Sequence, residues 1–189
     1  MQDNASTGMT LPISVTLRDG RQVMLREIRE QDREALLAAF DRLSPDSRYT
    51  RFMMAMRNPP AALLEAAMHP IPGREFALVA VSAEGGAERI VGSARYVGVP
   101  GTDHCEFGIT VADDWHGLGL ASRLLGMLIE AASAQGFHCI EGYVLAANTP
   151  MRRLARRLGF VDSQCDDDAT LRTVSRSLAG GGCGEAPPP

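Results

Sequence analysis

Hydrophobic and polar residues alternate near the start of the chain. Ile13, Val15 and Leu17 are separated by polar residues, an Asp-Gly pair follows at 19–20, and extended sequence resumes over 23–28. This pattern predicts a β-hairpin, because a tight Asp-Gly turn favours antiparallel pairing of the segments on either side. Residues 1–10 are polar and aperiodic, and we expect a flexible tail there.

Three helical segments are predicted after the hairpin. The first begins near Asp32, which can cap it, and stops at Ser44-Pro45. Its apolar face consists of Leu36, Leu37, Phe40 and Leu43. Proline is favoured at a first helical turn, so a second short helix is expected from Pro45 to Phe52. A third is expected over 61–68, and this helical run is a candidate wall of a substrate site.

Strands dominate the middle of the chain. Residues 76–81, FALVAV, form a continuous apolar run that is typical of a strand buried on both faces. Further strands are predicted over 89–99, which Gly92 interrupts, and over 106–111. A strand over 138–145 follows a helix, so it should pair in parallel with the strand before that helix. Residues 161–178 predict one or two more strands.

The stretch from Glu106 to Ser122, EFGITVADDWHGLGLAS, joins a strand to a long helix through an acidic, glycine-rich turn. The helix follows from an apolar stripe at helical spacing, made of Ala121, Leu124, Leu125, Leu128, Ile129 and Ala132. Gly117 and Gly119 stand where the helix begins, so a ligand can approach backbone N–H groups that lack intrahelical partners. Such a helix start attracts phosphates, which predicts a nucleotide-containing cofactor.

Composition narrows the class of protein. The chain has 189 residues, 45% of them hydrophobic and 22% charged, which suits one globular domain, expected over 11–178. Residues 179–189 are rich in Gly and Pro and are expected to be disordered. A net charge of −4 without a basic stripe argues against nucleic-acid binding. Because no apolar run approaches the ~18 residues of a membrane span, and the N-terminus does not resemble a signal peptide, we expect no membrane partner and a cytoplasmic location.

The cysteines give no metal pattern. Cys105, Cys139, Cys165 and Cys183 lie far apart, with no C-x-x-C pair and no histidine at metal-ligand spacing. We therefore expect no metal, and reduced thiols of the kind usual in a cytosolic protein.

With these motifs identified, residues 13–178 resemble the GNAT superfamily of N-acetyltransferases. The cofactor motif of that family reads Gln or Arg, Gly, any, Gly, any, Gly or Ala, and segment 116–121, HGLGLA, matches it except at His116. A second landmark, Asn followed by a helix that ends in Leu-Gly-Phe, is present from Asn148 to Phe160. The resemblance implies an α/β fold with a mixed, twisted sheet of six or seven strands and helices on both faces.

Three further segments resemble the acetyltransferase domain of bacterial Pat-type protein lysine acetyltransferases. They are LRDGRQVMLREI, LSPDSRYTRF, and EFGITV leading into WHGLGLA. The resemblance implies direct transfer of acetyl from acetyl-CoA to a primary amine, with a protein lysine as the first choice of acceptor. A small-molecule amine and a catalytically silent sensor of acyl-CoA are the alternatives. The state of assembly, monomer or homodimer, stays open.

The resemblance also assigns site residues. It implies Glu106 as the base that takes a proton from the amine, whereas a glutamate at a strand end is otherwise simply solvated. The pantetheine arm would pair with the strand at Ile109, Thr110 and Val111, and Asn148 would contact it. The pyrophosphate would lie against a segment made of His116, Gly117, Leu118, Gly119, Leu120, Ala121 and Ser122. Asp113 and Asp114 are expected to shape the turn, because carboxylates repel a pyrophosphate.

One family feature is missing. Many GNAT enzymes place a tyrosine in the last helix to protonate the departing thiolate, and Ala155 stands at that position here. A thiol pKa of about 8.5 lets the thiolate leave without much help, and Tyr143 on the preceding strand is the fallback donor. Four arginines in this helix are expected mainly to face solvent, with one or two meeting a CoA phosphate or an acidic partner. They are Arg152, Arg153, Arg156 and Arg157.

Overall fold

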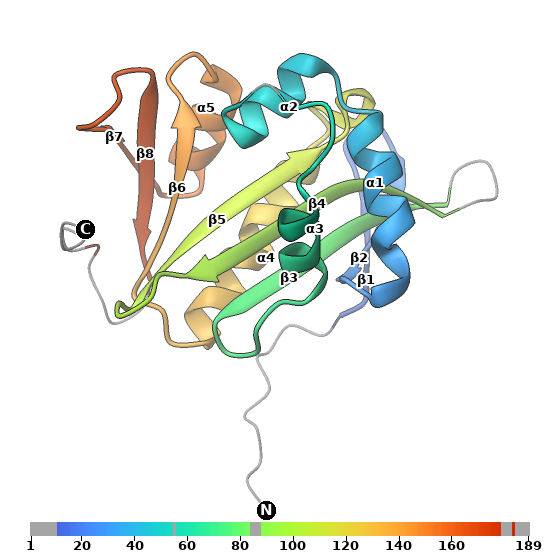
Figure 1. Ribbon diagram of the computed structural model, residues 1–189, viewed down its shortest axis with the longest axis horizontal. Helices are drawn as coiled ribbons and strands as arrows, with labels where there is room; N and C mark the ends of the chain where they lie inside the picture. Colours follow the sequence, from blue (N-terminus) through green and yellow to red (C-terminus); the bar gives the residue numbers. More distant parts are fainter. Residues whose placement is uncertain (1–10, 55, 84–87, 179–182, 184–189) are drawn as a thin grey trace, which may run out of the picture.

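The structure is a computed structural model that describes residues 11–54, 56–83, 88–178 and 183. Eight strands form one mixed sheet in the order β1-β2-β3-β4-β5-β6-β8-β7 (Figure 1). The strands are β1 (Ile13–Thr16), β2 (Gln22–Glu27), β3 (Glu75–Ser82), β4 (Arg89–Gly98), β5 (His104–Val111), β6 (Cys139–Leu145), β7 (Val161–Gln164) and β8 (Leu171–Ser177). The helices are α1 (Arg33–Asp41), α2 (Pro45–Phe52), α3 (Ala61–Met68), α4 (Leu120–Ala134) and α5 (Thr149–Arg157), with short 3-10 turns η1 (Glu30–Asp32) and η3 (Asp113–Trp115).

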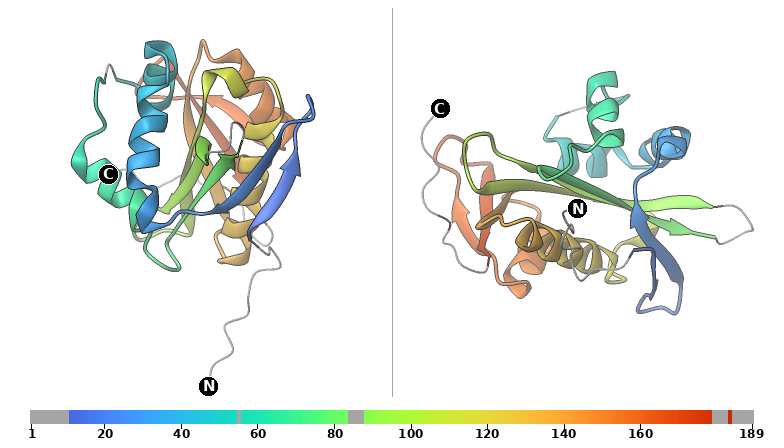
Figure 2. Two further views of the ribbon diagram at one scale, coloured as in Figure 1. Left: turned by 90° about the vertical axis from the view of Figure 1, so that its right-hand side faces the viewer. Right: turned by 90° about the horizontal axis from the view of Figure 1, so that it is seen from below.

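Helices cover both faces of the sheet, as predicted (Figure 2). On one face the apolar stripe of α4 packs against the central strands, and Leu124, Leu125 and Leu128 are fully buried there. On the opposite face, α1 packs against a smaller cluster that includes Val79 and Val81. None of the helices in the described ranges is long and apolar enough to cross a bilayer.

The predicted α/β fold is confirmed, with eight strands where six or seven were expected. The difference arises because both ends of segment 161–178 are strands: β7 pairs with β8, and β8 pairs with β6 over seven residues. β4 continues through Gly92 without a break, but its pairing with β3 is irregular beside this residue. The register there shifts so that Ala80 faces Gly92 while Val81 faces Ile90, which leaves Val91 as the extra residue of a β-bulge.

Two neighbouring strands in the middle of the sheet diverge. β5 and β6 are parallel, as predicted, but they pair only at His104–Cys139, Cys105–Ile140 and Glu106–Glu141. Beyond that point β5 follows β4, whereas β6 follows β8 (Figure 1). We call this divergence the split. Along it, the edge of β5 from Phe107 to Val111 has no neighbouring strand within the described sheet.

The expectation of reduced thiols is wrong for two of the cysteines. Cys139 at the start of β6 forms a disulfide with Cys183, whereas Cys105 and Cys165 are free. The pairing depends on the return of β8 beside β6, because Ser177 lies opposite Cys139 and the N–H of Leu178 donates to the carbonyl of His138 at 2.8 Å. The predictions for residues 1–10, and for 179–189 apart from Cys183, lie outside the described residues.

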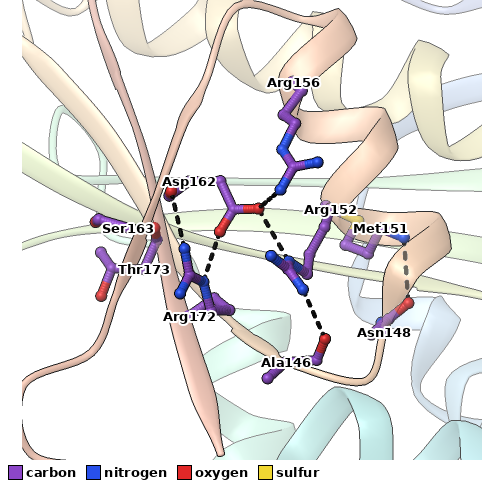
Figure 3. A network of polar contacts seen from close by, with 9 residues as sticks. All are labelled: Ala146, Asn148, Met151, Arg152, Arg156, Asp162, Ser163, Arg172 and Thr173. Carbon is purple, nitrogen blue, oxygen red and sulfur yellow. Dashed lines mark hydrogen bonds and ion pairs between the residues drawn. The ribbon is translucent and has the colours of Figure 1, made fainter. Parts of the chain in front are cut away.

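A buried carboxylate ties α5 to the last hairpin. Asp162 of β7 accepts from Arg152 at 2.9 Å, from Arg156 at 2.6 Å and from Arg172 at 2.7 Å, and its side chain is 3% exposed (Figure 3). Burial opposes its ionisation, but the hydrogen bonds from the three guanidinium groups outweigh that and lower the pKa of Asp162 to about 2. Arg152 and Arg156, expected on a solvated face, are therefore structural.

Replacing Asp162 by Asn should cost about 2 kcal/mol of unfolding free energy at pH 7, because three clustered guanidinium groups lose their counter-charge. An aspartate in an unfolded chain has a pKa of about 3.9. The stabilisation is therefore present above pH ~4 and is lost as the pH falls from about 4 to about 2. Urea unfolding across this range measures both effects. Asp167→Asn, in the exposed turn before β8, is the control and should change stability by less than about 0.5 kcal/mol. Equal stability of Asp162→Asn and the wild type at pH 7 would contradict this assignment.

Candidate functional site

The free edge of β5 leads directly into the turn that opens α4. Ile109, Thr110 and Val111 are half-buried along this edge. His116 reaches back to the end of the strand, where its Nε2–H donates to the carbonyl of Val111 at 2.9 Å. His116 thus holds the turn against the strand at the motif position where the family has Gln or Arg.

We call residues 112–119 the glycine turn. Its backbone conformation leaves room for a ligand to approach closely. Gly117 and Gly119 have φ angles of 75° and 94°, in the left-handed region that disfavours other residues. A Cβ built on Gly117 would meet no atom within 4 Å, so the space beside it is open. Gly119 is the N-cap of α4 and offers no side-chain acceptor to the first N–H groups of the helix. An uncapped helix start of this kind favours an anion.

The β1–β2 hairpin supports the glycine turn from behind. The N–H of Arg18 donates to the carbonyl of Leu118 at 3.2 Å. Arg21 donates to the carbonyl of Asp114 at 2.9 Å and lies over the Trp115 ring at 3.9 Å from its centroid. Backbone and side-chain contacts from a distant part of the chain therefore fix the position of Leu118 and its neighbours.

Asp113 joins the glycine turn to α2. Its carboxylate accepts from the N–H and the hydroxyl of Ser44, at 3.0 and 2.9 Å, and from the hydroxyl of Ser47 at 2.6 Å. Burial opposes its ionisation, but these hydrogen bonds prevail and lower the pKa of Asp113. Asp113 therefore shapes the turn, as expected, and it also anchors the N-terminus of α2.

Asn148 lies just beyond the end of β6, on the other side of the split. Its Oδ1 accepts from the N–H of Met151 at 3.1 Å and so caps α5 (Figure 3). Arg152, held by Asp162, donates to the carbonyl of Ala146 at 2.9 Å and fixes the loop that carries Asn148. The capping bond uses the carbonyl oxygen of the Asn148 side chain, and no hydrogen bond from its amide nitrogen is seen in the described part of the chain.

Glu106 is the last residue of β5 that pairs with β6, and it lies next to Glu141 of β6. Residues in register on parallel strands point to the same face, so the two carboxylates are neighbours. The pKa of Glu106 is raised, first because surrounding protein removes part of its water and then because Glu141 is negative, while the Arg51 guanidinium acts the other way. A solvent-accessible carboxyl whose pKa is shifted towards neutrality is a candidate general base.

Arg51, from the last turn of α2, completes this group and was missed by the sequence analysis. Its guanidinium lies over Gly108, where a Cβ would be only 2.6 Å from Cζ. Gly108 is two residues after Glu106 on the same face of β5, which is why glycine is needed there. The only sequence signal was the segment LSPDSRYTRF, which carries Arg51 but does not reveal where its side chain points.

Two positions bear on the proton donor for the thiolate. Ala155 is fully buried in the core and carries no titratable group. Tyr143 is 44% exposed and lies on the same face of β6 as Glu141. Its pKa is raised, first by desolvation and then by the carboxylates of Glu141 and Glu106, so it keeps its proton at neutral pH. Tyr143 stays the candidate acid.

One group of side chains resembles a metal site by distance alone. Ligand atoms of His104, Cys139 and Glu141 lie within 4.8 Å of one another. The sulfur of Cys139 is bonded to Cys183, so it is not available as a thiolate ligand.

Comparison with known proteins points to acetyltransferases. The model of a family described as an acetyltransferase (GNAT) domain matches residues 22–161. An acetyltransferase of Pseudomonas aeruginosa is 39% identical over 155 residues, covering 82% of this chain and 83% of the relative. Acetyltransferase Pat of Mycolicibacterium smegmatis is 35% identical over 152 residues, covering 79% of this chain but 44% of the relative. The crystal structure of the GNAT domain of S. lividans PAT superposes with a TM-score of 0.79 at 26% identity, covering 88% of this chain and 97% of that domain.

Gly119→Ala should lower the unfolding free energy by about 1–2 kcal/mol, because an alanine at φ 94° is strained. Gly126→Ala makes the same chemical change inside α4, where a Cβ meets nothing within 4 Å, and it should raise stability by up to about 1 kcal/mol. Denaturant unfolding measures the unfolding free energy of both variants. Effects of the same sign at the two positions would contradict the left-handed geometry of the turn.

Proposed function

The chain belongs to the GNAT acetyltransferase family, and on that premise we propose that it moves acetyl from acetyl-CoA directly to a primary amine. The observation that carries this proposal is the split. Glu106 stands where β5 and β6 last pair, and the uncapped start of α4 follows the other end of the same free strand edge. A candidate base and a candidate anion site therefore flank one unpaired strand edge.

The split suits an extended cofactor with an anionic end. The edge of β5 at Ile109, Thr110 and Val111 offers backbone groups that the amides of a pantetheine arm can pair with, as an added strand does. The open space at Gly117 and the N–H groups at the start of α4, up to Ser122, suit a pyrophosphate. The amide nitrogen of Asn148 is the side-chain donor proposed for the pantetheine.

Proton transfer to Glu106 starts the proposed reaction. An alkylamine with a pKa near 10 is mostly protonated at pH 7, so Glu106 takes a proton from it directly or through one water. The freed amine attacks the thioester carbonyl and the C–N bond forms. The nitrogen then loses its second proton to water, and the C–S bond breaks to release the CoA thiolate. Tyr143 or solvent then protonates the thiolate.

Two acceptor classes have support. Similarity to Pat and to the GNAT domain of PAT favours a protein lysine, which we place first. A small-molecule amine is the second candidate, because a pocket of about 120 Å³, lined mainly by apolar residues, lies between the sheet and helices α1–α3 close to Arg51. A pocket of that size suits a single side chain rather than a folded surface.

Glu106→Gln should leave the acetyl-CoA dissociation constant within about threefold of wild type and slow acetylation by about 100-fold or more, because only the base is lost. Calorimetry measures binding, and a thiol assay of CoA release with a broad panel of amines measures turnover.

Mass spectrometry of proteins incubated with enzyme and acetyl-CoA identifies modified lysines. Wild type that binds acetyl-CoA but releases no CoA with any amine would instead be a sensor. Product found only on small amines would reject the lysine acceptor.

The acid limb of kcat/KM should report the raised pKa of Glu106, with activity lost as the pH falls through it and the base becomes protonated. Glu141→Gln removes the neighbouring negative charge, so the pKa of Glu106 should drop and the limb should move to lower pH. Glu130→Gln, an exposed residue of α4, is the matched control and should not move it. An unmoved limb in Glu141→Gln would show that Glu106 is not the titrating base.

A further inference from the structure

Arg51 is a partly buried cation without a counter-ion among the described residues. No carboxylate lies within ion-pair distance of it in the described residues, and its one aromatic contact is its neighbour Phe52 at 5.0 Å. Nearby arginines are satisfied: Arg95 pairs with Glu75 at 3.2 Å, and Arg48 donates to three backbone carbonyls. A partly desolvated charge that the protein leaves unpaired favours an anionic ligand.

The electrostatic surroundings of Arg51 favour an anionic ligand. Burial, and then the positive charge of Arg95, lower the pKa of Arg51 to about 10, whereas Glu106 acts in the opposite direction. Arg51 therefore remains charged at neutral pH. Glu106 lies near enough to influence Arg51 but forms no ion pair with it among the described contacts.

The pocket beside Arg51 has the size of one apolar side chain. It measures about 120 Å³ and lies between α1–α3 and strands β3–β5. Its apolar lining includes Leu36, Phe40, Phe52, Leu63, Leu64 and Ile90. A cavity of about 150 Å³ with a similar lining holds benzene, so this one suits a leucine, methionine or aromatic side chain and excludes a longer segment.

We propose that Arg51 binds a carboxylate of the acceptor while the acceptor's apolar group fills this pocket. Arg51 and Glu106 present one cation and one anion on the same face, which complements a carboxylate and an ammonium group carried by one molecule. A free apolar α-amino acid has all three groups, and so does a lysine flanked by an acidic and an apolar residue. The assignment rests on the proposed acetyl transfer and names the class of acceptor: an amine that also carries a carboxylate and one apolar group.

A simpler role for Arg51 predicts a different result. If its charge only favours ionisation of Glu106, its removal should slow every acceptor alike and move the acid limb. If it binds a carboxylate, its removal should selectively weaken acceptors that carry one, mainly through KM.

The first arm uses free amines. Wild type should prefer L-leucine over L-leucinamide, in which a neutral amide replaces the carboxylate, by about 10- to 100-fold in kcat/KM, the size expected of a charge-assisted hydrogen bond. In Arg51→Gln the preference for L-leucine over L-leucinamide that depends on the carboxylate should disappear. Arg51→Lys should keep part of this preference. Arg33→Gln, which removes a guanidinium from α1 that pairs with Glu65 at the surface, should leave the ratio unchanged.

The second arm uses short peptides in which the residue before a single lysine is Glu or Gln and the residue before that is Leu. A preference for Glu in the peptides but none for leucine identifies a protein segment as the acceptor. The reverse identifies a small molecule. No preference for a carboxylate in either pair, or a preference that survives in Arg51→Gln, overturns the proposal.

A binding measurement separates this inference from the reaction itself. With CoA present, calorimetry should show that wild type binds N-acetyl-leucine more tightly than N-acetyl-leucinamide, and that Arg51→Gln binds them equally. If these results hold while no amine is acetylated, the proposed activity fails and the role of Arg51 stands. Equal binding of both compounds by wild type, together with no preference between the peptides, overturns the role of Arg51. Urea unfolding confirms that the variant folds, and removal of an unpaired charge should not lower its stability.

Discussion

The split between β5 and β6 is the constraint on which the rest of the site depends. Each strand keeps a full antiparallel partner on its outer side, and the two share only the pairs up to Glu106 and Glu141. The sheet is therefore continuous, yet it contains an unpaired strand edge in its middle. Unpaired backbone groups favour a partner that can complete the ladder. The proposed cofactor position follows from this single feature of the sheet.

Polar contacts between distant segments keep the split and its surroundings in register. Asp113 connects the glycine turn to the start of α2, and the same helix carries Arg51 over Gly108 at its other end. Hydrogen bonds to a charged carboxylate contribute about 1.5–3 kcal/mol each, and here they also fix the geometry of the site. Because α2 contacts both the glycine turn and β5, it connects the proposed anion site to the proposed acceptor site.

Periodicity and turn chemistry predicted the parts of this fold that depend on neighbours in sequence. The stripe of α4, the hairpin before Gln22, and the glycines that open α4 were all readable, because each reflects local backbone preference. The role of Arg51 was not, since it depends on a helix crossing a strand more than fifty residues away in the chain. Arg152 and Arg156 of α5 were predicted to face solvent, but β7 brings Asp162 within ion-pair distance of both. The disulfide likewise needed β8 to return beside β6.

The most direct test is a crystal structure with CoA bound. We expect the pantetheine amides to bond to the edge of β5 between Ile109 and Val111. The pyrophosphate should lie against the N–H groups from Gly117 to Ser122, and the sulfur should lie at the end of the split near Glu106. CoA bound elsewhere on the molecule, or a sulfur facing away from Glu106, would contradict the account.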